Sequence, residues 1–82
     1  MSFYVTRVPL GGTHFDLRFH KIQAGRNVKY FILAIDTKGT EYPFCMEEKN
    51  GEWRLIHAPK PIDDVIKNEQ TLSRIIKLHL AR

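Results

Sequence analysis

The segment from Thr13 to Lys21 alternates apolar and polar residues without interruption. Phe15, Leu17 and Phe19 take every second position, and polar or charged residues take the positions between them. Side chains alternate between the two faces of a β-strand, so this segment predicts a strand with one face on a core and the other in water. Antiparallel sheets commonly have one solvated face, and we therefore expect a sheet of this kind.

Four further segments have the β-branched and aromatic content of strands, and turn residues separate them. We expect strands over residues 3–8, 13–22, 28–36, 40–48 and 52–57. Asn50-Gly51 is a strong hairpin signal, and it predicts that the last two strands are antiparallel neighbours. The segment from Asp36 to Gly39 is expected to form a turn in which the glycine takes a positive φ.

Two of these strands have features that predict their place in the sheet. Residues 30–35 are apolar without a break, which predicts a strand covered on both faces. Pro43 cannot donate to a ladder of hydrogen bonds. We therefore expect the strand over residues 40–48 to lie at an edge of the sheet or to be bulged at the proline.

The chain after Pro59 predicts a helix over residues 61–81. Its apolar residues follow a spacing of three or four, at Ile62, Val65, Ile66, Leu72, Ile76 and Leu80, with an interruption at Glu69. Acidic residues near its start and basic residues near its end complement the helix dipole. Asn68 leaves an alternative open, in which a short helix over residues 61–67 precedes a main helix over residues 69–81 with Asn68 as its cap.

The expected fold class is α+β, with a four- to five-stranded antiparallel meander followed by a C-terminal amphipathic helix packed on one face. A chain of 82 residues suffices for a single small domain over residues 1–82 with one core. A helix covers one face of the sheet, so the opposite face is left to water or to a partner. The polar positions of the alternating strand lie on that face: His14, Asp16, Arg18 and His20.

The excess of basic residues lies in the first half of the chain. Residues 1–38 contain six Lys or Arg against two acidic residues, whereas residues 39–82 contain seven of each. Such an excess can mark a polyanion-binding face, although solvated surfaces often show it as well. The residues expected to bind single-stranded nucleic acid are Arg7, Arg18, Lys21, Arg26 and Lys29 for phosphates, with Tyr30 and Tyr42 for base stacking.

Two kinds of partner follow from this pattern. The expected element order is similar to that of whirly-like single-stranded DNA-binding domains, at the level of topology and without a shared sequence motif. This similarity favours single-stranded DNA or RNA as the ligand. The alternative is a protein-interaction or homo-oligomerisation module, in which the free sheet face or an edge at Thr40 to Glu48 pairs with another protein or with a second copy.

The sequence contains no recognisable catalytic or metal-binding motif. The four histidines lack the spacing of metal ligands, and Cys45 lies in an apolar segment where a buried, unreactive thiol is expected. We therefore expect no enzymatic activity, no metal and no cofactor. A single cysteine, the absence of a signal-peptide core in the first ten residues and the absence of a membrane-spanning stretch predict a cytoplasmic protein without membrane contact.

Overall fold

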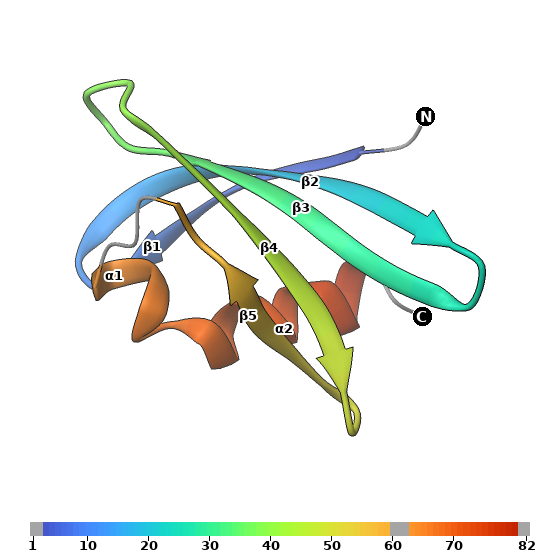
Figure 1. Ribbon diagram of the computed structural model, residues 1–82. Coiled ribbons are helices and arrows are strands. Elements are labelled where there is room, and N and C mark those ends of the chain that lie inside the picture. Colours follow the sequence, from blue (N-terminus) through green and yellow to red (C-terminus); the bar gives the residue numbers. More distant parts are fainter. Residues whose placement is uncertain (1–2, 60–62, 81–82) are drawn as a thin grey trace.

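In the computed structural model, five strands form one antiparallel sheet in the order of the chain (Figure 1). The structure describes residues 3–59 and 63–80. The strands are β1 (Phe3–Leu10), β2 (Thr13–Ala24), β3 (Asn27–Ile35), β4 (Glu41–Lys49) and β5 (Glu52–His57), and the helices are α1 (Asp63–Ile66) and α2 (Glu69–His79). The predicted α+β meander with a C-terminal helix packed on it is confirmed.

Three two-residue turns set the register of the sheet. The pairs that close them are Leu10–Thr13, Ala24–Asn27 and Lys49–Glu52. In the last turn Asn50 and Gly51 have φ angles of 54° and 82°, which is typical of a type I′ turn and confirms the predicted hairpin. The pair that closes a two-residue hairpin is hydrogen-bonded. From that pair onward, every second residue directs its backbone N–H and C=O toward the paired strand, and the residues between them direct theirs away from it.

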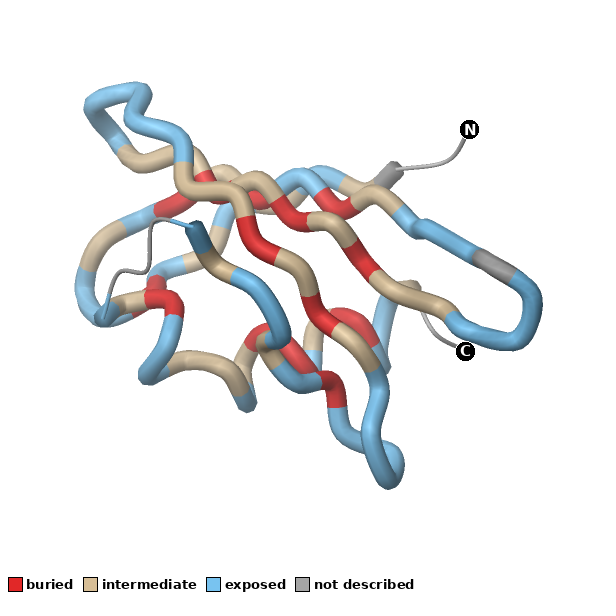
Figure 2. The backbone as a smooth tube through the Cα atoms, viewed as in Figure 1, coloured by how far each residue is buried: buried red, intermediate tan, exposed pale blue. Residues whose placement is uncertain are grey.

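The core lies between one face of the sheet, here called the inner face, and the two helices. Figure 2 shows buried positions alternating along the central strands, and the predicted core positions Phe15, Leu17 and Phe19 are among them. Hydrophobic burial explains this arrangement, because each strand contributes every second side chain to the same apolar layer. The helices complete the core with Val65, Leu72 and Ile76.

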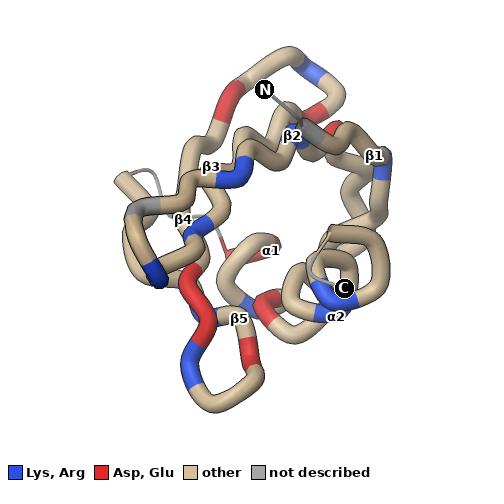
Figure 3. Tube along the Cα trace, turned by 90° about the vertical axis from the view of Figure 1, so that its right-hand side faces the viewer, with Lys and Arg blue, Asp and Glu red and all other residues tan. Residues whose placement is uncertain are grey.

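The sheet is curved, and α2 lies between its two outermost strands. In the end-on view of Figure 3, the strands curve around the core and α2 lies between β5 and β1. Helix α2 packs along β5. Near its C-terminal end, the ring of His79 stacks on Tyr4 of β1, with 5.4 Å between the ring centroids. The other face of the sheet is here called the outer face.

The helical region contains two helices rather than one, so the broken alternative is the one observed. The interruption comes at Lys67 and Asn68. The side chain of Asn68 does not cap α2; its Nδ2 donates to the backbone oxygen of Asp64 at 2.6 Å and so binds the preceding turn. Residues 61, 62 and 81, which belong to the predicted helix, lie outside the described residues.

β4 is not an edge strand, because it pairs with β3 on one side and with β5 on the other. The prediction of an edge along Thr40 to Glu48 is therefore wrong for residues 45–48, whereas residues 41–44, which include Pro43, have no partner strand on the β5 side within the described residues. The effect of Pro43 is nevertheless visible, since β5 pairs no further along β4 than Cys45. The missing N–H of the proline thus interrupts no bond between these strands. The register also shifts between Cys45 and Met46.

Candidate functional site

The outer face of β3 and β4 is apolar, and neither of the two described helices covers it. Five side chains form a continuous group, here called the outer patch: Phe31, Leu33, Ile35, Pro43 and Cys45. All five are half-buried by their neighbours in the sheet, and none belongs to the residues packed on the core. The prediction that both faces of β3 are covered is wrong for the described part of the chain, because both helices pack on the inner face.

Exposed apolar side chains extend the outer patch toward β1 and β2. Val5 on β1 is 50% exposed and Ile22 on β2 is 46% exposed. Arg18 lies between Val5 and Leu33 in the register of the sheet. The methylene stem of an arginine can continue an apolar surface while its guanidinium remains in water.

The outer face carries charges of both signs. By strand alternation, the outward cations on β1, β2 and β3 are Arg7, Arg18 and Lys29, and the outward carboxylates on β2 and β4 are Asp16, Glu41 and Glu47. Lys29 Nζ lies 3.6 Å from Glu47 Oε2. By the same alternation Lys49, at the end of β4, also faces outward, so β1–β4 direct four cations and three carboxylates to this face.

The closest ion pair of the outer face joins Arg7 and Asp16. Arg7 Nε donates to Asp16 Oδ1 at 2.8 Å across β1 and β2. This hydrogen bond raises the pKa of Arg7 and lowers the pKa of Asp16. Both groups are exposed, so solvent screens the pair and its contribution to stability is small.

The basic residues predicted to bind phosphates do not share one surface. Arg7, Arg18 and Lys29 lie on the outer face. Lys21 lies two residues after Phe19 on β2 and therefore on the opposite, inner side of the sheet. Arg26 lies in the turn between β2 and β3. Figure 3 likewise shows Lys and Arg positions spread over several strands and α2.

The two tyrosines predicted to stack on bases belong to the inner side of the sheet. Tyr30 is only 2% exposed and meets Trp53 edge to face, with 5.1 Å between ring centroids, so its predicted exposure is wrong. Burial raises the pKa of Tyr30. Tyr42 packs against the core, and its hydroxyl donates to Asp36 Oδ2 at 3.4 Å. Even-numbered residues of β3 and β4 face inward because Ile32 pairs with the core residue Phe19.

Among the described side chains, Phe31 is the phenyl ring of the outer face, and it was not predicted as a site residue. Its ring centroid lies 6.2 Å from that of His20 on the neighbouring strand. The alternation of side chains along a strand could have identified Phe31, because a strand with Tyr30 and Ile32 on the inner face must place Phe31 on the outer face. The uninterrupted apolar run concealed that alternation.

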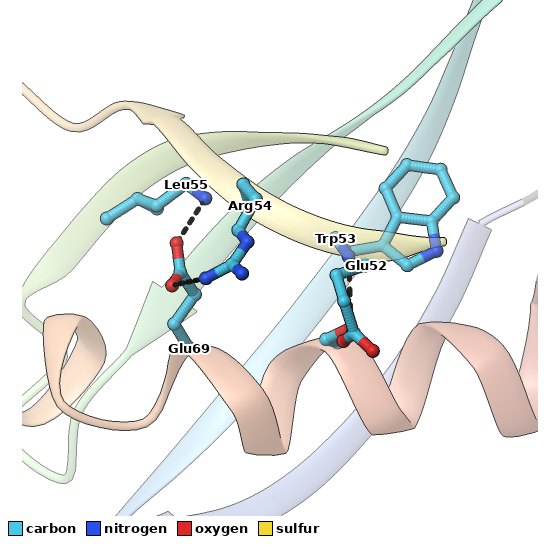
Figure 4. Close-up of polar contacts among 6 residues, drawn as sticks. Glu52, Trp53, Arg54, Leu55 and Glu69 are labelled. Atoms are coloured by element: carbon cyan, nitrogen blue, oxygen red, sulfur yellow. Dashed lines mark hydrogen bonds and ion pairs between the residues drawn. The ribbon is translucent and has the colours of Figure 1, made fainter. Parts of the chain in front are cut away.

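The outer edge of β5 is occupied by side chains of α2 (Figure 4). The backbone N–H of Trp53 donates to Ser73 Oγ at 3.0 Å, and the backbone N–H of Leu55 donates to Glu69 Oε2 at 2.7 Å. Four helical residues rise about 6 Å and two strand residues about 6.7 Å, so alternate amides of β5 match successive turns of α2. These contacts leave β5 closed to another strand.

Ion pairs line the groove between β5 and α2. An open cleft of about 570 Å³ is lined by Glu52, Trp53, Arg54, Glu69, Gln70, Ser73, Arg74 and Lys77. Arg54 Nη1 lies 3.3 Å from Glu69 Oε1, and Lys77 Nζ lies 2.8 Å from Glu52 Oε1. The Lys77 hydrogen bond lowers the pKa of Glu52. Since most of its carboxylates and cations bind each other, the groove holds the helix to the sheet.

Comparison with models of known protein families, with characterised proteins and with solved structures found no match. Among the described residues, no group of three or more His, Cys, Asp or Glu is placed to hold a metal ion. Over the same part of the chain, no helix has the length and apolar character needed to cross a membrane. The features that bear on function are therefore the outer patch and the edges of the sheet.

Proposed function

We propose that this protein is a non-catalytic protein-interaction module that binds another protein through the outer patch. The observation that supports the proposal is the group of five apolar side chains on β3 and β4 that no described element covers. Apolar patches with a polar rim are characteristic of protein-binding surfaces. Phe31 supplies an aromatic side chain of the kind that anchors such interfaces.

The distribution of charge favours a protein over a nucleic acid as the ligand. Polyanion binding depends on cations that neutralise phosphates. On the outer face, Arg7 and Lys29 already bind carboxylates of neighbouring strands. A nucleic acid would have to displace these carboxylates, and the buried ring of Tyr30 offers it no stacking surface. A mixed-charge rim instead suits a protein surface, which also carries both signs.

Leu33→Glu tests the proposal, because it places a charge beside Pro43 near the middle of the outer patch. The side chain does not pack on the core, so the variant is expected to fold with a free energy of unfolding within about 1 kcal/mol of the natural chain. Thr37→Glu is the matched control, since Thr37 is exposed in the turn after β3.

A partner isolated with the natural chain is purified and titrated against each variant. We expect Leu33→Glu to raise the dissociation constant by about tenfold or more, the equivalent of roughly 1.4 kcal/mol, and Thr37→Glu to leave it unchanged. Equal affinity for Leu33→Glu and the natural chain would refute the role of the outer patch.

A second titration addresses nucleic acid directly. A labelled single-stranded oligonucleotide is titrated with the protein at two salt concentrations and followed by fluorescence anisotropy. Tight binding that weakens steeply with salt, and is lost on Arg18→Glu with Lys29→Glu, would replace the protein ligand by a nucleic acid. We expect no such binding.

We further propose a cytoplasmic location. The chain has one cysteine, and Cys45 lies half-buried within the outer patch rather than in the core. A thiol at a protein-binding surface persists in a reducing compartment, where disulfides are rare.

A further inference from the structure

Helix α2 lies between the two edge strands, but over the described residues its side chains bind the backbone of β5 and not that of β1. On β5, Ser73 and Glu69 accept the outward N–H groups of Trp53 and Leu55. On β1, the other edge strand, no hydrogen bond joins the free side of the backbone to any loop or side chain among residues 4–59 and 63–80. Unpaired edges are where a further strand adds, and proteins commonly block them.

The turn at Gly11 and Gly12 determines which groups β1 leaves open. Leu10 pairs with Thr13 across this two-residue turn, so Leu10 hydrogen-bonds β2. Every second residue before it does the same. The residues between them turn their backbone groups to the free side, and the outward N–H groups therefore belong to Phe3, Val5 and Arg7.

Two observations support this assignment. The same rule, applied to the turn between β4 and β5, turns the N–H groups of Trp53 and Leu55 outward, and these are the groups that α2 binds. In β1 the rule also turns Pro9 outward. A proline in an edge strand is tolerated where its missing N–H would have faced solvent.

We propose that a second copy of this chain adds its β1 to this open edge, antiparallel and about a two-fold axis, so that the two sheets become one. A register with Thr6 opposite Thr6 of the second copy places Tyr4 opposite Val8. Both side chains are partly buried at the margin of the core, and an added strand would bury them further. The outward N–H groups of Val5 and Arg7 would each find a carbonyl of the second copy.

The charge of β1 agrees with a second copy as the occupant. Arg7 is the one charged residue of the strand. In this register Arg7 lies opposite Val5, so like charges do not face each other. A register centred on Arg7 would oppose the two guanidinium groups. The inference does not depend on the outer patch, because pairing through the edge leaves the outer face uncovered.

Sedimentation velocity over a range of protein concentrations tests the proposal. The natural chain is expected to shift from 9.6 kDa toward twice that mass as concentration rises. Val5→Pro removes an outward N–H and places a ring on the free edge without removing a donor to β2. It should raise the dimer dissociation constant about tenfold or more, because two hydrogen bonds per dimer are lost. Val5→Thr, the matched control, should dimerise as the natural chain does.

Cysteine cross-linking provides a second test that does not depend on the folding of the proline variant. In a Cys45→Ser background, Thr6→Cys should form a disulfide-linked dimer in air. Residues directly opposite each other at a non-hydrogen-bonded position have Cα atoms about 4.5 Å apart, within the range for a disulfide. Arg7→Cys is the control, because the register keeps the two residues apart despite their greater exposure.

Three results would overturn the proposal. The natural chain could remain at 9.6 kDa at every concentration. Thr6→Cys and Arg7→Cys could cross-link at equal rates. A dimer could also survive Val5→Pro and dissociate with Leu33→Glu, which would assign the contact to the outer patch and leave the proposed function intact.

Discussion

Ser73→Ala tests how α2 holds the edge of β5. Ser73 is 2% exposed; its Oγ accepts the Trp53 N–H at 3.0 Å and donates to Glu52 Oε2 at 3.3 Å. Alanine would leave the buried Trp53 N–H against a methyl group, and an unsatisfied buried donor costs about 1–3 kcal/mol. The higher helix propensity of alanine returns about 0.5 kcal/mol. We therefore expect a net loss of about 1–2 kcal/mol in the free energy of unfolding.

The assay uses Trp53 itself, which is the one tryptophan of the chain and is buried. Its emission follows unfolding in urea and on heating. A loss of 1 kcal/mol lowers the Tm of a domain this size by about 4–8 °C. The control is Gln70→Ala, at an exposed position of α2, which should change stability by no more than about 0.5 kcal/mol.

Equal stability of Ser73→Ala and Gln70→Ala would refute the reasoning. It would mean that the remaining contacts of α2, among them the apolar contacts of Leu72 and Ile76, suffice to hold the helix in place. Glu69→Ala and Glu69→Gln extend the test along the same edge. Only glutamine retains an acceptor for the Leu55 N–H, so it should cost less.

Two further predictions concern a turn and the response to acid. Gly11 and Gly12 both have positive φ, but a Cβ would meet the Asp64 carboxylate only at Gly11. Gly12→Ala should therefore lower the free energy of unfolding by about 1–2 kcal/mol, and Gly11→Ala should lower it by more. Asp64→Ala should recover that difference in urea unfolding, and equal costs at the two glycines would contradict the contact. The pKa values of Glu52 and Asp16 are lowered in the folded state, so both ionised carboxylates stabilise the fold. This contribution is complete above their unfolded pKa of about 4 and is lost as the pH falls through the folded pKa. Glu52→Gln with Asp16→Asn should therefore flatten the decline of Tm between about pH 5 and pH 2, whereas parallel curves would show that these carboxylates do not contribute.

Much of the fold follows from local patterns in the chain. The alternation around Phe15, Leu17 and Phe19 identifies an inner face because period two is a property of the strand itself. The turn at Asn50-Gly51 follows from residues that tolerate positive φ. The break near Asn68 was one of two open alternatives, because the apolar spacing was compatible with one helix or with two.

The candidate site was harder to predict, because it depends on which strands become neighbours. The run from Tyr30 to Ile35 has no periodicity of its own, so its parity is set by pairing with β2, which turns Tyr30 inward and Phe31 outward. The basic residues of the first half were identified, but their ion pairs were not. Asp16 meets Arg7, and Glu47 meets Lys29, only through the register between strands.

The amino-acid sequence determines the elements of this protein, their order and their turns, because these depend on residues close together in the chain. The assembled fold determines which strands form the edges, which side of β3 is buried and where charges are neutralised. β4 is interior because β5 pairs along it, and the outward amides of β5 are bound because α2 folds back along that strand. These features depend on contacts between residues that are distant in the sequence. Such contacts stabilise the protein only when the sheet and α2 pack together and bury their apolar side chains.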